Sequence, residues 1–156
     1  MQRVNFPAGS EPIMLRVSPD GKYVWVQTYK TNMNYVLDAD SMAVMNAIQA
    51  GTDPEQSAFQ PNGGPYGMIA HLSDSFLLVL DSSTGNEVAR IELGKTQANI
   101  SYTADGAIAF VTSPTGDEVV VIDMARLAVM ARLSTGKTPM GLALVTLPGF
   151  STSGTL

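Results

Sequence analysis

Three short sequence markers recur along the chain at a spacing of 42 or 43 residues, and this period constrains the fold more than any other feature. The first marker is a turn sequence that ends in glycine and occurs at 18–21, 60–63 and 103–106. The other two markers are an aspartate that follows an apolar run and a single glycine. They fall at Asp38, Asp81 and Asp123, and at Gly9, Gly51, Gly94 and Gly136. Because the three markers keep one register, we expect three repeats, at 9–50, 51–93 and 94–135.

Each repeat contains short segments that are rich in β-branched and aromatic residues and are bounded by polar turns, as β-strands are. In the first repeat these segments are 13–17, 22–28, 34–37 and 43–48. The Asp-Gly and Asn-Gly pairs of the turn marker supply the positive φ of a tight turn between the first two strands. Four short antiparallel strands in about 42 residues are typical of a β-propeller blade. The expected fold is therefore all-β, with three four-stranded antiparallel blades.

The residues outside the three repeats resemble parts of further blades. Residues 3–8 match the last strand of a repeat, and residues 139–145 match the first strand, so we expect a half-blade strand at each end. Residues 1–146 would then form a partial propeller, followed by a flexible tail at 147–156. Because a propeller typically closes with four to eight blades, three blades need a cover for their end faces. Two explanations stay open, namely a homodimer or other small closed oligomer, and a piece of a longer propeller.

Several segments match a known repeat pattern. They are Trp25-Val26-Gln27-Thr28, Phe110-Val111-Thr112-Ser113, Val119-Val120-Val121-Ile122-Asp123 and Gly136-Lys137-Thr138-Pro139. On these residues the chain resembles the YVTN-type β-propeller repeat family, whose relatives include surface-layer-like proteins, lactonase-like enzymes and haem-d1 domains. The resemblance implies a propeller fold and an extracytoplasmic location, periplasmic or secreted. The first residues of this chain, however, lack the apolar run of a secretion signal.

The composition argues against several kinds of site. The formal net charge is −5 and the nine Lys and Arg residues are scattered, so no nucleic-acid partner is expected. The chain has no cysteine and one histidine, which excludes thiolate sites and multi-histidine metal sites. His71 falls at the repeat position of Thr28 and Ser113, so we expect a structural role for it. No apolar run is long enough for a spanning helix, so no membrane insertion is expected. We therefore expect no enzyme activity, no cofactor and no metal.

A binding face is expected where the loops between blades and the turns between the two middle strands share one end of the propeller. The candidate ligand-binding residues are polar side chains of these loops that break the repeat. They are Glu11, Asp53, Glu55, Gln56, Lys95, Gln97 and Lys137. The sequence thus predicts a non-enzymatic binding or scaffold module for a protein, glycan or small molecule, which closes a ring with copies of itself. The alternative is a fragment of a propeller enzyme, lactonase-like or haem-d1-like.

Overall fold

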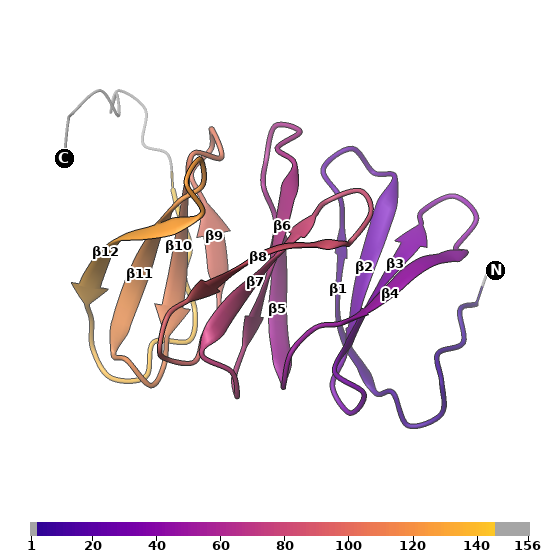
Figure 1. The fold of residues 1–156 in the computed structure, drawn as a ribbon, viewed down its shortest axis with the longest axis horizontal. Helices are drawn as coiled ribbons and strands as arrows, with labels where there is room; N and C mark the ends of the chain where they lie inside the picture. The colour runs from indigo at the N-terminus through magenta and orange to yellow at the C-terminus, as the bar shows by residue number, and fades with distance from the viewer. Residues whose placement is uncertain (1–2, 146–156) are drawn as a thin grey trace.

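The computed structural model describes residues 3–145, which form twelve strands in three four-stranded antiparallel sheets. Blade 1 is the sheet β1–β4, blade 2 is β5–β8 and blade 3 is β9–β12, each with its strands in chain order. The bounds are β1 Pro12–Val17, β2 Tyr23–Thr28, β3 Met33–Asp38, β4 Val44–Gln49, β5 Pro54–Phe59, β6 Tyr66–His71, β7 Phe76–Asp81, β8 Glu87–Glu92, β9 Ile100–Tyr102, β10 Ile108–Ser113, β11 Glu118–Asp123 and β12 Ala128–Ser134. Figure 1 shows the three sheets side by side in chain order, with the two termini at opposite ends. This arrangement confirms the predicted fold class.

The turn glycines and the register of the strands explain how each blade forms. Gly21, Gly63 and Gly106 have φ between 72° and 74°, so they provide the predicted turns between the first two strands of the blades. The pairing between the third and fourth strands shifts by one residue in every blade, as in a β-bulge. The bulged residue of each fourth strand is turned out to solvent. Residues 3–145 contain no helix, and hence none that could cross a membrane.

Each sheet carries apolar side chains on both faces, as sheets do that stack face to face, and blade 2 is covered by a neighbour on both sides. We call the face toward the preceding blade the N-side face and the face toward the next blade the C-side face. The C-side face of blade 1 meets the N-side face of blade 2 through Trp25, Ile69 and Leu78, all fully buried. The C-side face of blade 2 meets blade 3 in a larger cluster that includes Met68 and Val120. The core is therefore a stack of two interfaces between sheets.

The two end segments differ from the expected strands. Residues 3–8 and 139–145 pair with no strand, because a ladder needs a neighbouring strand edge and both segments lie against the face of a sheet. Phe6 instead packs its ring on Tyr35, with 4.8 Å between ring centroids, on the N-side face of blade 1. The predicted tail at 147–156 lies outside the described residues.

Candidate functional site

The loops between blades and the turns between the two middle strands lie together, as the sequence analysis expected. The Ser73 hydroxyl, in the β6–β7 turn, donates a hydrogen bond to the Asp53 carboxylate in the loop before β5. The hydroxyls of Thr96 and Thr115 repeat this contact in blade 3, 3.0 Å apart. Asp117 accepts a hydrogen bond of 2.9 Å from the backbone N–H of Thr138. We call this part of the surface the loop end.

Five of the seven predicted site residues lie in the loops of this region, whereas Glu55 and Gln56 lie on β5 and not in the expected loop. The seven side chains differ in exposure. Glu11, Lys95 and Lys137 are exposed, Asp53, Glu55 and Gln56 are half-buried, and Gln97 is fully buried. The exposed residues come from three different loops, and the structure joins none of these three to another by a hydrogen bond or ion pair among the described residues. The loop end therefore offers exposed polar side chains that are separate from one another.

Two of the seven residues bind the backbone of the protein itself. The Gln97 side-chain oxygen accepts from the N–H of His71 at 3.3 Å, and its amide nitrogen donates to the carbonyl oxygens of Asp74, at 3.2 Å, and Lys95. The Gln56 oxygen accepts from the N–H of Ile100 at 2.5 Å, and so links blade 2 to blade 3. Both amides thus hold neighbouring blades together. The sequence singled out Gln56 and Gln97 only because they are polar residues in or next to predicted loops, and it gave no sign of their contacts with the backbone.

His71 is fully buried between blades 1 and 2. Its Nδ1 lies 3.1 Å from the carbonyl oxygen of Phe76, and its Nε2 contacts the carbonyl oxygen of Ala50, the last residue before the loop into blade 2. Burial lowers the pKa of the His71 imidazole below its ordinary value, while the two carbonyl contacts and Asp74 oppose this shift. The imidazole of His71 therefore links two backbone segments, one at Phe76 and one at Ala50.

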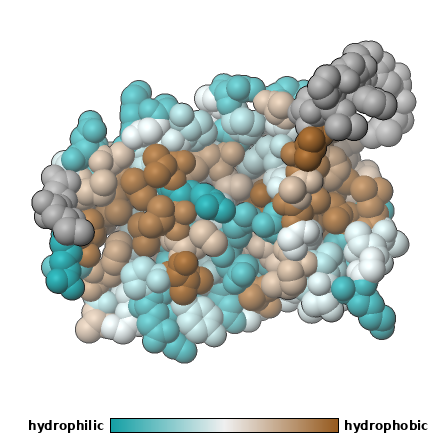
Figure 2. Space-filling view, turned by 180° about the vertical axis from the view of Figure 1, so that it is seen from behind, coloured by the Kyte–Doolittle hydropathy of each residue, from teal (hydrophilic) through white to brown (hydrophobic). Residues whose placement is uncertain are grey.

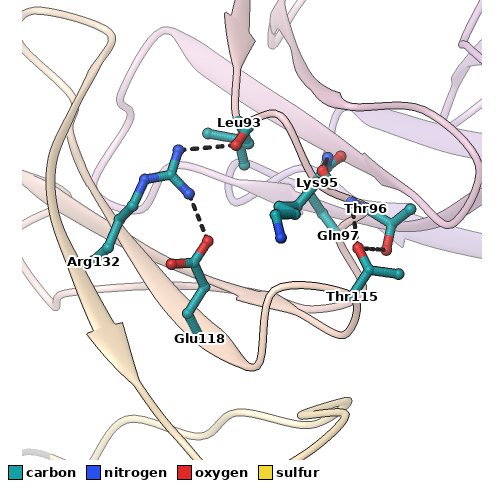
Figure 3. A network of polar contacts seen from close by, with 7 residues as sticks. All are labelled: Leu93, Lys95, Thr96, Gln97, Thr115, Glu118 and Arg132. Carbon is teal, nitrogen blue, oxygen red and sulfur yellow. Dashed lines mark hydrogen bonds and ion pairs between the residues drawn. The ribbon is translucent and has the colours of Figure 1, made fainter.

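A polar network that the sequence analysis missed joins blades 2 and 3 beside the loop end (Figure 3). Arg132 on β12 binds Glu118 at 2.5 Å and donates to the carbonyl oxygen of Leu93 at 2.9 Å. Figure 3 places Lys95 between this ion pair and the Thr96–Thr115 contact. The available signal was the recurrence of arginine four residues before the marker glycine, at Arg90 and Arg132.

The recurring aspartates stabilise turns, as predicted. Asp38 Oδ1 accepts from the N–H of Ser41 at 2.7 Å, and Asp123 Oδ1 accepts from the N–H groups of Ala125 and Arg126. Within residues 3–145, no group of three or more His, Cys, Asp or Glu residues is arranged to hold a metal ion.

Two classes of exposed apolar side chains are distinguished when equivalent positions of the blades are compared. Met45, Val88 and Met130 are the bulged residues of the three fourth strands, and all are exposed, so this exposure belongs to the outer rim of every blade. Leu15 on β1 belongs to the second class. It is 58% exposed, whereas Ile100, its equivalent in blade 3 by strand register, is 3% exposed.

The second class is confined to the two ends of the stack. Leu133 is 49% exposed, whereas Ile91, at the same place before the marker glycine of blade 2, is 5% exposed. Ile13 and Val17 flank Leu15 on the N-side face of blade 1 and are also exposed. Figure 2 shows brown surface toward both ends of the molecule on this side. The end faces therefore expose positions that a neighbouring blade covers inside the stack.

Comparisons with known proteins support the fold. No family model matches the sequence, and no curated protein sequence matches it. Among solved structures, hydrazine synthase from Kuenenia stuttgartiensis matches with a TM-score of 0.76 and 21% identity, over 89% of this chain and 40% of that chain. Dihydro-haem d1 dehydrogenase matches with a TM-score of 0.69 and 21% identity, over 79% of this chain and 28% of that chain.

A third similar structure is a putative 6-phosphogluconolactonase from Bacteroides fragilis, with a TM-score of 0.69 and 18% identity, over 83% of this chain and 40% of that chain. These proteins are of propeller type, so the chain has the fold of three β-propeller blades. It spans 40% or less of the length of each of the three.

Proposed function

We propose that the chain is a non-enzymatic propeller scaffold that completes a ring with a second copy of itself and binds a partner at its loop end. The observation that carries this proposal is the exposure of Leu15, whose equivalent Ile100 is buried against the preceding blade. Covering such a surface is favourable by about 25 cal/mol for each Å² of apolar area removed from water. Identical subunits usually cover exposed apolar end faces of this kind by forming a closed assembly.

The binding part of the proposal is supported by the side chains of the loop end. The side chains of Glu11, Lys95 and Lys137 are exposed and make no hydrogen bond or ion pair among the described residues. They come from three of the four loops that precede or follow a blade, so ring closure would place them around one opening. A protein or glycan surface with several polar groups is the kind of ligand that such a ring of separate side chains fits. The resemblance to YVTN-type repeats supports an extracytoplasmic location.

The assembly is tested by native mass measurement and sedimentation at increasing protein concentration. We expect a closed dimer or another small closed oligomer, and Leu15→Asp should weaken it because a carboxylate would be buried in the contact. Val88→Asp is the matched control, since Val88 is exposed on the rim of a blade that has neighbours on both sides. A monomer at every concentration would overturn the proposal, and open polymers would indicate a structural array.

The second candidate is part of a propeller enzyme, and similarity to the dehydrogenase and to the putative lactonase favours it. Lactone hydrolysis and haem binding by the chain are direct tests. Either activity, lost with substitution of loop-end residues, would replace the scaffold proposal.

A further inference from the structure

The two end segments occupy the places where strands of neighbouring blades would lie. Thr112 Oγ1 donates to the carbonyl oxygen of Met140, and Ser101 Oγ donates to that of Leu142, both at 3.2 Å. These contacts put residues 140–142 on the C-side face of blade 3. Inside the stack, the first strand of the next blade lies there, because Ser57 Oγ on β5 donates to Gln27 on blade 1 at 3.0 Å.

Sequence register gives the same placement. Counted from the marker glycine, Pro139, Leu142 and Leu144 correspond to Pro12, Leu15 and Val17 on β1. The pattern Pro-x-x-Leu-x-(Val/Leu) is therefore present twice. One copy belongs to a complete sheet, and the other covers blade 3 as a single segment with no ladder of its own.

The N-terminal segment is in the reciprocal situation. Phe6 lies three residues before its marker glycine, as Ile91 and Leu133 do. Ile91 packs against blade 3, and Phe6 packs against blade 1 in the same way, on Val24, Tyr35 and Leu37. Phe6 thus occupies the place where a residue such as Leu133 of a preceding blade would lie.

We propose that both segments are displaced when the ring closes. The β1 strand of a second copy replaces residues 139–144 on blade 3, and the β12 strand of a second copy replaces residues 3–8 on blade 1. This inference rests on the proposed ring and adds its mechanism. The docked segment and the second copy would bind the same face of blade 3, so they compete for it. The complete sheet also brings Val24 and Val26 beside β1, and so covers more of the C-side face than one segment does.

If the segment competes with the second copy, removing it should tighten dimerisation. If the segment instead forms part of the contact, removing it should weaken dimerisation. If the segment is docked in about nine-tenths of the molecules, then removing it should tighten dimerisation about tenfold, since only the open fraction binds. Leu142→Asp disfavours docking of the segment, so it should tighten dimerisation, whereas Leu15→Asp on the equivalent position of β1 should weaken it. Truncation after residue 138 tests the same point, because it leaves all three sheets intact.

The absence of cysteine in the chain allows a direct test of the contact. Trp25 and Phe59 are in contact across the interface between blades 1 and 2, with 4.5 Å between ring centroids. Their equivalents at the closing interface are Phe110 on β10 and Val17 on β1. A mixture of Phe110→Cys and Val17→Cys chains should form a mixed cross-linked dimer, in higher yield with the truncated chains. Phe110→Cys with Met45→Cys, on the outer rim, should not.

The results separate this inference from the proposed function. A dimer that tightens with Leu142→Asp and with truncation, and that cross-links through the cysteine pair, supports replacement. A dimer that weakens with both changes would show that residues 139–144 are part of the contact, and would overturn replacement while the ring stands. Monomers for the whole chain and for the truncated chain would overturn both.

Discussion

At the scale of single residues, the interface between blades 1 and 2 depends on the absence of a side chain at Gly67. A Cβ atom there would lie 2.3 Å from Cη2 of Trp25, which is fully buried. Because Gly67 is paired in β6 on both sides, its backbone cannot move away freely. We expect Gly67→Ala to lower the free energy of unfolding by about 1–3 kcal/mol, as overpacking does. Urea unfolding followed by tryptophan fluorescence measures this, since Trp25 is the only tryptophan.

Gly136→Ala is the control for the Gly67 variant, because a Cβ at that position meets nothing within 4 Å. It should change stability by no more than about 0.5 kcal/mol. Trp25→Phe should restore part of the loss in the double variant, since it removes the atoms that clash. This double variant needs dichroism in place of fluorescence. Equal losses of stability in the Gly67 and Gly136 variants would contradict a steric clash with Trp25 as the cause.

His71 should make the fold sensitive to mild acid. Burial lowers its pKa in the folded chain, so the unfolded chain binds a proton first as the pH falls. The free energy of unfolding should therefore decrease below the ordinary pKa of about 6.5, and continue to fall until the pH reaches the lower folded-state pKa. His71→Gln should lose this part of the pH dependence, and the effect can be assigned because the chain has one histidine. Unfolding measured in small pH steps through this window tests it; identical slopes in both proteins would refute it.

At the scale of strands and turns, Asp81 shows how the recurring aspartates work. Its Oδ1 accepts from the N–H groups of Ser83, at 3.0 Å, and Thr84, at 2.7 Å, and from both hydroxyls. We expect Asp81→Ala to destabilise the fold by about 1–2 kcal/mol, because these donors lose their acceptor. Asp81→Asn keeps the oxygen and should cost less. Thermal unfolding of the two variants in parallel gives the comparison, and an alanine variant as stable as the asparagine variant would exclude the role.

The strands and turns were predictable because they repeat. The Asp-Gly turn before β2 and the apolar run of β11 are local patterns, and three copies in one register remove the ambiguity of any single copy. The segment at 139–145 was not predictable as unpaired, because its composition matches β1 and only the absence of a neighbouring backbone separates the two. Local sequence determines whether a strand can form, and tertiary contacts determine whether it does.

The candidate site was predictable as a place but less so in its residues. Loop positions counted from the repeat place Asp53 and Thr96 at one end of the blades, where they contact Ser73 and Thr115. The burial of Gln97 depends on backbone groups of two blades, and this contact has no signature in the sequence.

At the scale of the whole molecule, one strand offers a matched pair of residues that distinguishes a ring from an isolated stack. Leu133 and Met130 lie on β12 with nearly equal exposure, 49% and 48%. Met130 is the bulged residue and has exposed equivalents in both other blades, whereas Ile91, the equivalent of Leu133 in blade 2, is buried. Only Leu133 is therefore expected to contact a neighbouring blade.

Leu133→Asp should weaken dimerisation by about tenfold or more, since burying an unpaired carboxylate costs at least the 1.4 kcal/mol that one decade represents. Met130→Asp adds the same charge to the same strand, so it should leave the dimerisation constant within about twofold. Both variants should unfold like the parent chain under conditions where it is monomeric, because both side chains face solvent there. Sedimentation at several concentrations measures the constants. Equal weakening would point to charge repulsion between copies, and no change in either variant would remove β12 from the interface.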